Sequence, residues 1–350
     1  MPWRWRARAG EGFAGADGPA TAVRFEGVDR GTRVIGVLSG GVGAARLLGG
    51  LVQVVDPASI TAVVNTGDDV ELHGLHISPD LDTIVYTLAG AVNPETGWGL
   101  IGETWQAMGA LDRYADVRPL ASAAGATWFR LGDKDLATHM YRTHRMAEGA
   151  SLSEVTAEIT GAWGLGLRLV PMTDDQVETR FTVDGEGELG FQEYFVARRH
   201  DVAVAAVRFA GAESARPAPG VLDALRSADT IVIAPSNPLI SIGPILAVPG
   251  IRDELIARRD RVVAISPIVA GAALKGPADR LMADLGFESS VVGVARIYAD
   301  VASALVVDVA DSGLVDAVQG VGMRCVVAET VMSTPAIAAA LAETAITSAG

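Results

Sequence analysis

The sequence is poor in cysteine, in positive charge and in long apolar runs, and each shortage excludes a class of protein. Cys325 is the only cysteine among 350 residues, so no disulfide can form within the chain, and we expect a buried core thiol. Lys and Arg number 28 against 42 Asp and Glu, which gives a net charge of −14 at pH 7. A chain this acidic has no electrostatic basis for binding duplex nucleic acid or an anionic membrane face.

The chain also lacks membrane and export signals. No stretch reaches the roughly 18 uninterrupted apolar residues of a membrane span. The basic N-terminus, residues 1–6, is not followed by the apolar segment of a secretory signal, so we expect a cytoplasmic protein. Residues 10–31 are rich in Gly, Ala and acidic side chains. We therefore expect residues 1–33 to be a poorly ordered extension and residues 34–345 to form the folded domain.

Short β-branched runs alternate with helical patterns from residue 34 onward. This alternation predicts an α/β fold with a doubly wound, mostly parallel, Rossmann-like sheet. The predicted strands are 33–38, 60–65, 230–234, 261–266, 290–294 and 324–328, and the predicted helices are 44–52, 81–89, 102–111, 135–148 and 151–163. Segments 179–183 and 189–198 read as an antiparallel hairpin with 202–209 as a possible third strand. Residues 135–210 are thus expected to form a central insertion of helices and a hairpin.

A glycine-rich turn joins the first predicted strand to its helix. Gly40, Gly41 and Gly43 allow a ligand to approach the backbone, and amides at the new helix N-terminus attract anions. The turn is not a Walker A loop, because no Gly-Lys-Ser/Thr follows it. It also departs from the dinucleotide fingerprint, because Arg46 stands where Gly or Ala is needed. The pattern favours phosphate or nucleotide contact over a merely tight turn.

Two acidic loops follow, at residues 65–69 and 79–83. Asp68 and Asp69 come just after a predicted strand, while Asp80 and Asp82 open a predicted helix. Each pair has an ordinary explanation, namely solvation for the first and helix capping for the second. Four aspartates beside a phosphate-type turn instead favour Mg²⁺, which prefers hard carboxylate oxygens.

Other polar residues are weaker candidates. His73 and His76 lie between the acidic loops, but without cysteine we favour loop or supporting histidines over zinc ligands. An acid-rich turn opens the predicted helix 135–148, and two further polar turns follow strands at the edge of the sheet where ligands bind. The candidate residues are Asp133, Asp135, Thr138 and His139 in the first group and Ser236, Asn237, Pro238 and Ser266 in the second.

The motifs taken together resemble those of the 2-phospho-L-lactate transferase family, which includes an actinobacterial phosphoenolpyruvate transferase branch. The resemblance runs from about residue 34 to 334 and rests on the ordered motifs SGGVGAAR, VVNTGDD, HGLHISPDLDTIVYTLAG, LGDKDLATH, FQEYFV, IAPSNPLISIGPILAVPGIR and SPIVAG. It implies a step of coenzyme F(420) biosynthesis. In that step the deazaflavin alcohol 7,8-didemethyl-8-hydroxy-5-deazariboflavin attacks a guanosine diphosphate-type donor and GMP leaves.

The resemblance also implies roles for residues. Asp68 and Asp80 match the family's metal-binding aspartates, Mg²⁺ is the implied metal, and a homodimer is the implied assembly. Asp69 and Asp82 are supporting residues or candidate bases. The turn from Gly40 to Arg46, with Asn65 and the turn 236–238, is expected to bind the donor, and the group from Asp133 to His139 the deazaflavin.

Alternatives and the choice of acid stay open. A Rossmann-type NAD(P)-dependent oxidoreductase would place Asp68 on a ribose, and a nucleotide-sensing protein would use the same fold without catalysis. The sequence does not decide between phospholactate and phosphoenolpyruvate, although its Ala-, Gly-, Val- and Arg-rich composition favours phosphoenolpyruvate. No Ser-His-Asp or Cys-His arrangement suggests a covalent nucleophile.

Overall fold

A central parallel sheet organises the protein. The computed structural model describes residues 33–349 apart from 120–121, 123–128, 184, 186 and 199–201, so almost all of the predicted extension lies outside the described residues. The described chain forms a seven-stranded sheet in the order β14-β13-β10-β9-β1-β2-β5. Its strands are β1 (Ile35–Ser39), β2 (Ile60–Val64), β5 (Arg168–Pro171), β9 (Thr230–Ile233), β10 (Val262–Ile265), β13 (Ala304–Asp308) and β14 (Arg324–Ala328).

The strand order identifies the predicted fold class. Counted along the chain, the strands lie in the order 3-2-1-4-5-6-7, and every pair in this sheet is parallel. This is the doubly wound order of Rossmann-like sheets, with its reversal between the first and fourth strands. The α/β prediction is confirmed, and the reversal lies between β1 and β9.

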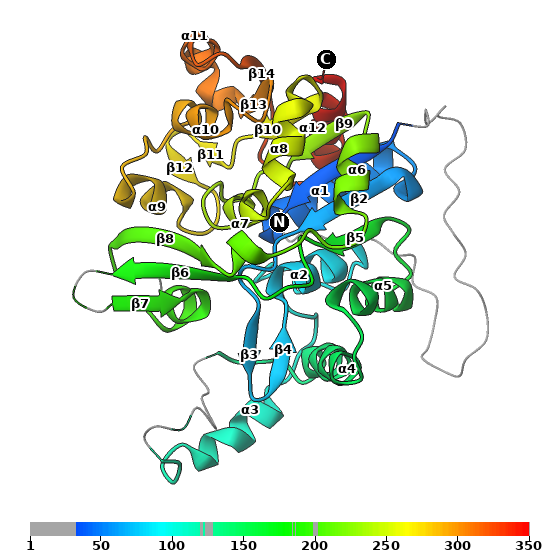
Figure 1. Ribbon diagram of the computed structural model, residues 1–350, viewed down its shortest axis with the longest axis vertical. Coiled ribbons are helices and arrows are strands. Elements are labelled where there is room, and N and C mark those ends of the chain that lie inside the picture. Colours follow the sequence, from blue (N-terminus) through cyan, green and yellow to red (C-terminus); the bar gives the residue numbers. More distant parts are fainter. Residues whose placement is uncertain are drawn as a thin grey trace.

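Helices cover both faces of the sheet (Figure 1). Alternate strand residues enter opposite cores: Ile35 and Val37 pack on one face, whereas Leu38 packs on the other. The first face carries α1 (Gly41–Val54), α2 (Pro79–Leu88), α5 (Leu152–Ala162) and α12 (Pro335–Thr347), and the second carries α6 (Val221–Ser227), α7 (Ile242–Ala247), α8 (Ile251–Ala257) and α10 (Val291–Tyr298). Burial on both faces explains the near-continuous apolar runs of these strands.

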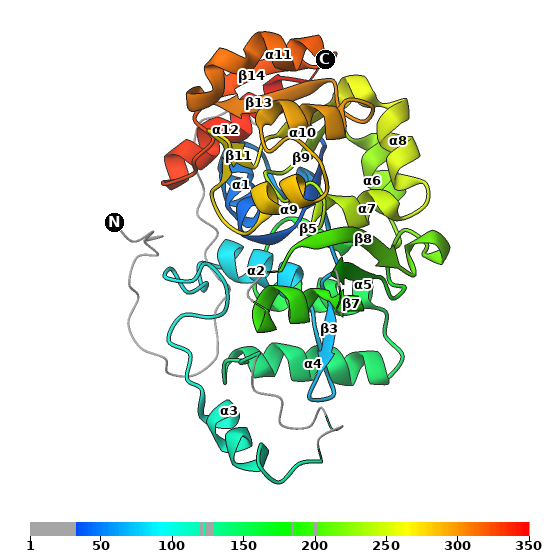
Figure 2. The same cartoon turned by 90° about the vertical axis from the view of Figure 1, so that its left-hand side faces the viewer.

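Smaller elements extend beyond the sheet. Figure 1 and Figure 2 both show the hairpin β3 (Val70–Leu72) and β4 (Leu75–Ile77) with α3 (Gln106–Leu111) and α4 (Asp135–Ala147) at the end opposite α11 (Val315–Gly320). A second sheet has the order β7-β6-β8 and comprises β6 (Glu178–Val183), β7 (Gly187–Gly190) and β8 (Val204–Ala210). A second two-stranded pair, β11 (Ile268–Val269) and β12 (Ala272–Ala273), precedes α9 (Ala278–Asp284).

The range expected to be an insertion is interrupted by the sheet. Residues 135–210 contain α4, α5 and the three-stranded antiparallel sheet, but also β5, which pairs in parallel with β2. The helices and the antiparallel sheet are therefore separate excursions on either side of β5. Helix α5 begins where the predicted helix 151–163 begins, and Ser151 and Glu154 form a reciprocal capping box there.

Two predicted strands are wrong in part or in full. Residues 290–294 begin helix α10, whose N-terminus is capped by the Ser290 hydroxyl accepting from the amides of Val292 and Gly293. A short apolar run fits a buried strand or a buried helix equally well by periodicity. In the predicted strand 189–198, only residues up to Gly190 pair in β7, and a π-helical turn follows at Glu193–Ala197.

Candidate active site

The loops after β1 and β9 meet at the reversal of strand order. The Ser236 hydroxyl after β9 donates to the Gly40 carbonyl after β1 at 2.7 Å, which joins the two loops. They line a cavity of about 970 Å³. In open α/β sheets, ligands bind outside the carboxyl ends of strands at this point, and the volume is that of a ligand site.

The predicted glycines allow close backbone approach. A Cβ on Gly43 would lie 2.2 Å from the Pro235 carbonyl oxygen, and one on Gly40 would lie 2.9 Å from Asp80 Oδ2. Gly41 opens α1 with φ +69°, a left-handed conformation that favours glycine. The turn thus brings the first amides of α1 directly against the acidic loop.

Most of the predicted site residues line this cavity, and the rest support it from outside or lie elsewhere. The lining residues among them are Gly40, Gly41, Gly43, Arg46, Asp68, Asp80, Asp82, Asp135, His139, Ser236, Asn237 and Ser266. Those not in the lining are Asn65, Asp69, Asp133, Thr138 and Pro238.

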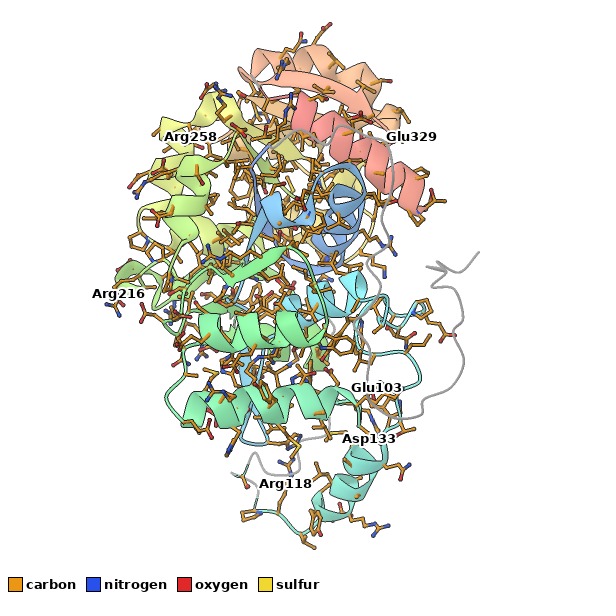
Figure 3. The ribbon with its side chains drawn as sticks, turned by 90° about the vertical axis from the view of Figure 1, so that its right-hand side faces the viewer. Glu103, Arg118, Asp133, Arg216, Arg258 and Glu329 are labelled. Atoms are coloured by element: carbon orange, nitrogen blue, oxygen red, sulfur yellow. The ribbon has the colours of Figure 1, made fainter. Side chains whose placement is uncertain are left out.

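Asp133 lies outside the cavity lining because its carboxylate caps another helix. Its carboxylate accepts from the Thr104 hydroxyl and, at 3.0 Å each, from the amides of Gln106 and Ala107, so it caps α3. The Thr104 contact and these amides lower the pKa of Asp133. Figure 3 shows Asp133 beside Glu103, whose carboxylate accepts from the Lys134 amide at 2.8 Å. The acid-rich turn therefore connects α3 to α4.

Asp68 and Asp80 form a buried acidic pair facing the cavity. Their exposed fractions are 4% and 8%. Asp80 accepts from Asn65 Nδ2 at 3.0 Å, and Asp68 Oδ1 has a long contact of 3.4 Å with the Thr179 hydroxyl. Burial, followed by the charges of Asp80 and Asp69, raises the pKa of Asp68 well above its usual value.

The pKa of Asp80 rises to about 7, first through burial and then through the charge of Asp69, against the lowering effect of Asn65. Burial also raises the pKa of Asp69. His76 Nε2 lies 3.0 Å from Asp69 Oδ2, and the Ser78 hydroxyl donates to the same oxygen at 2.7 Å. The other oxygen, Oδ1, is buried without a hydrogen-bond partner. Asp68 and Asp80, both buried in the cavity lining, offer carboxylate oxygens of the kind that a hard cation prefers.

Asp82 belongs to a second charged cluster, one with its own cation. Arg142, which is 1% exposed, reaches Asp82 Oδ2 at 3.1 Å through Nη1 and contacts Oδ1 through Nη2. Asp82, Asp135 and His139 could offer ligand atoms within 4.8 Å of one another, but the guanidinium already supplies positive charge beside Asp82. A sequence separation of 60 residues keeps this pair from being predicted from the sequence.

His139 connects this ion pair to Asp135 and Tyr86. Arg142 Nη1 lies 3.4 Å from His139 Nδ1, and Asp82 Oδ2 lies 3.6 Å from the same nitrogen. His139 Nε2 lies 3.3 Å from Asp135 Oδ2, and the Tyr86 hydroxyl lies 2.6 Å from Asp135 Oδ1. Burial opposes ionisation of Asp135, but His139 and Tyr86 outweigh it and lower its pKa. Thr138 joins the network 2.8 Å from the Tyr86 hydroxyl.

Positive side chains gather on another part of the cavity wall. Arg46 comes from α1, and Lys275 comes from the loop between β12 and α9. Burial lowers the pKa of Arg46. Burial and then the charge of Arg46 lower the pKa of Lys275. Acidic and basic groups thus occupy the same cavity, an arrangement suited to a metal and an anionic ligand together.

Aromatic side chains form the remaining wall. Tyr86, Trp98, Phe129, Phe191 and Phe195 all line the cavity, and the rings of Phe191 and Phe195 stack at 5.4 Å with planes 9° apart. None of these aromatic residues was a candidate from the sequence, although two of them lie in the FQEYFV motif. Aromatic rings at a cavity surface are suited to a planar ring system.

The polar turn residues use much of their hydrogen-bonding capacity on their own loops. Asn237 Oδ1 accepts from the amides of Leu239 and Ile240 at 2.9 and 3.3 Å. The Ser266 hydroxyl donates to the Ile268 carbonyl at 2.9 Å. Ser236 is similarly bonded to Gly40. These groups shape the cleft and leave the backbone and the nearby side chains to contact a ligand.

Comparison with known proteins agrees with this geometry. The family model of 2-phospho-L-lactate transferase CofD matches residues 35–330. The chain belongs to this family. It is therefore a transferase, and the family's reaction belongs to coenzyme F(420) biosynthesis. Among curated relatives, the phosphoenolpyruvate transferase of Streptomyces griseus is 46% identical over 89% of this chain and 96% of that protein.

A second curated relative and a solved structure extend the comparison. The phosphoenolpyruvate transferase of Thermobifida fusca is 43% identical over 89% of this chain and 96% of that protein. A Bacillus halodurans protein of the UPF0052 family shares the fold, with a TM-score of 0.56 at 15% identity over 90% of this chain and 99% of that one. Within the part of the chain that the structure describes, no helix is both long enough and apolar enough to cross a bilayer.

Proposed function

We propose that this transferase joins a phosphoenolpyruvyl group, carried on a guanosine diphosphate-type donor, to 7,8-didemethyl-8-hydroxy-5-deazariboflavin, with Mg²⁺ and release of GMP. The observation that carries the proposal is one cavity in which a buried acidic pair faces the N-terminus of α1 and Arg46. Phosphoenolpyruvate is preferred to 2-phospho-L-lactate because the two relatives described above carry that name.

The donor is proposed to bind at the glycine turn. Amides at the start of α1 and the Arg46 guanidinium attract its diphosphate. The reversal point beside Ser236 and Asn237 then receives the nucleoside. In the reaction the ribityl hydroxyl oxygen bonds to the phosphorus that bears the acid, and the hydroxyl proton is lost. The bond from that phosphorus to the bridging oxygen breaks, and GMP leaves with that oxygen.

Asp68 and Asp80 are proposed to hold Mg²⁺. They line the cavity, are nearly buried and have few hydrogen bonds for their charge. Bound Mg²⁺ would neutralise phosphate oxygens and favour departure of the leaving group. Asn65 holds Asp80 in position at 3.0 Å.

The acceptor is proposed to bind against the aromatic wall. Phe191 and Phe195 stack with each other and line the cavity, so the deazaflavin ring can lie along them. Asp135 and His139 lie in the lining, and Tyr86 hydrogen-bonds Asp135. These groups are placed to bind the polar edge of the acceptor or its ribityl hydroxyls.

Asp69 and Asp82 are proposed to support the site rather than to take the proton. The guanidinium of Arg142 occupies both oxygens of Asp82, and Asp69 lies outside the cavity lining. A carboxylate held in this way is a poor base. Positioning and electrostatics would then supply most of the rate enhancement.

Product mass tests the proposal directly. Purified protein, Mg²⁺ and the deazaflavin alcohol are incubated with the enolpyruvyl or the lactyl guanosine donor. The two products differ by two hydrogens, so mass spectrometry reads the transferred acid. We expect the enolpyruvyl product and GMP; a product from the lactyl donor alone contradicts the choice of acid. No product from either donor contradicts the proposed reaction.

The metal site is tested by Asp68→Ala and Asp80→Ala. We expect both variants to lose turnover at all Mg²⁺ concentrations while keeping a wild-type circular dichroism spectrum, because each removes a proposed ligand. Near-normal turnover in either variant would contradict the assignment of that aspartate as a Mg²⁺ ligand. A cytoplasmic location stays the expectation from the sequence, and a homodimer is proposed on the family resemblance; light scattering of the purified protein tests the homodimer.

A further inference from the structure

Lys275 occupies a distinctive place at the cavity. It lies on the loop between β12 and α9, on the side of the sheet where the strands end. Its Nζ donates to the Thr96 carbonyl at 3.0 Å, and a Cβ on Gly97 would lie only 2.8 Å from it. The ammonium therefore connects the β11–β12 side of the cavity to the loop that follows α2.

The hairpin before Lys275 is firmly anchored. Its turn consists of Ala270 and Gly271, both with positive φ (50° and 79°), the combination that two-residue hairpin turns require. Asp311, which is 5% exposed, accepts from the Ala270 amide at 3.0 Å and holds this uncommon alanine conformation. Ser266 fixes the entry to the hairpin through Ile268. Lys275 follows this hairpin, two residues after the end of β12.

Its charge is not matched by a neighbouring acid. Among the residues that the structure describes, Lys275 Nζ donates to a neutral carbonyl, and no carboxylate forms an ion pair with it. The charge that acts on it is that of Arg46, which has the same sign. Two cations in one partly desolvated cavity repel each other, and an anion bound between them would remove that repulsion.

We propose that Lys275 binds the donor diphosphate together with Arg46. Its ammonium exchanges the hydrogen bond to the Thr96 carbonyl for one to a phosphate oxygen. The identity of the anion rests on the proposed function, and the pairing of Lys275 with Arg46 rests on the cavity itself. A carbonyl is a weaker partner for an ammonium than a phosphate oxygen, so the exchange is favourable. Lys275 keeps its proton throughout and so contributes charge, not acid–base chemistry.

The chain supplies a matched control in Lys134. Its Nζ also donates to a carbonyl of the loop between α2 and α3, that of Ile101 at 2.7 Å, but Lys134 does not line the cavity. Lys134→Met therefore removes the same kind of tether without removing charge from the cavity. If Lys275 merely tethers the loop, the two methionine variants should behave alike.

Calorimetric titration with GDP and with guanosine at fixed Mg²⁺ separates these cases. We expect Lys275→Met to weaken GDP binding about tenfold or more, as loss of a charge-assisted contact would. Lys275→Arg should retain most of the affinity, Lys134→Met should match wild type, and guanosine binding should be alike in all four proteins. Thermal unfolding of each protein verifies its fold.

The contrary results are distinguishable. Equal GDP affinity in Lys275→Met and wild type overturns the inference and leaves the proposed function intact. Equal losses in Lys275→Met and Lys134→Met also overturn it, because they assign the effect to the loop. If wild-type protein binds no GDP at all, the proposed donor itself is wrong.

Discussion

The buried ion pair between Arg142 and Asp82 gives the largest stability change that we expect from one substitution. Arg142 is 1% exposed and Asp82 4%, so neither charge is solvated. The same guanidinium lies 3.4 Å from the His76 carbonyl and from His139 Nδ1. One side chain therefore ties α4 to α2 and to the β3–β4 hairpin.

Arg142→Met keeps an apolar stem of similar length and removes the cation. The Asp82 carboxylate is then left buried without a counter-charge, and such a loss destabilises proteins by about 3–5 kcal/mol. The lost contacts to His76 and His139 act in the same direction. We expect the free energy of unfolding in urea at neutral pH to fall by about this amount.

Two comparisons isolate the cause. Arg145 lies one turn further along α4 and pairs with Glu158, but both side chains are about one-third exposed, so Arg145→Met should have a much smaller effect. The double variant Arg142→Met with Asp82→Asn removes the stranded charge and should recover part of the loss. A loss in Arg142→Met no larger than in Arg145→Met, or no recovery in the double variant, would refute the reasoning.

Two further predictions concern the cleft. Gly43→Ala sets a Cβ 2.2 Å from the Pro235 carbonyl oxygen, so we expect GDP binding to be lost and the free energy of unfolding to fall by about 1–3 kcal/mol. The control Gly109→Ala, whose Cβ would have no heavy atom within 4 Å, should bind GDP normally. Equal GDP binding by both variants would contradict the close packing at Gly43. Because the pKa of Asp80 is raised to about 7, folded metal-free protein holds a proton there that the unfolded chain releases, so this contribution to stability is lost as pH rises from 3.8 towards 7. The melting temperature of EDTA-treated wild type should thus fall more steeply with pH than that of Asp80→Asn, and parallel slopes would exclude the raised pKa.

Local signals account for what could be read from the sequence. The helix that starts at residue 151, the glycine turn at Gly40 and the apolar strand of β1 each depend on signals within a few residues, and each was predicted. The buried helix α10 was not predicted, because residues 291–294 are apolar throughout. Their apolar pattern therefore has no periodicity that distinguishes a helix from a strand. Strand β13, which is buried throughout, gave no separate signal either.

Long-range pairings account for most of what was missed at the site. The acidic pair of Asp68 and Asp80 could be predicted because twelve residues and one hairpin separate them. Arg142 lies 60 residues from Asp82, and Lys275 is 179 residues from Thr96. Nothing near either cation in the sequence marks its partner, since the strand order alone decides which loops meet.

The distribution of charge in the cavity follows from that strand order. Asp68 and Asp80 follow β2, on one side of β1, whereas Lys275 follows β10, on the other side of β1. All three side chains line the same cavity. Each group is destabilised by its own surroundings: the carboxylates by burial and mutual repulsion, Lys275 by burial and Arg46. A metal-bound diphosphate would relieve both, because it presents a cation to the acids and an anion to the bases. The same unfavourable charges that weaken the metal-free protein would then favour binding of its donor, so the charges that cost stability are also the charges that would give affinity.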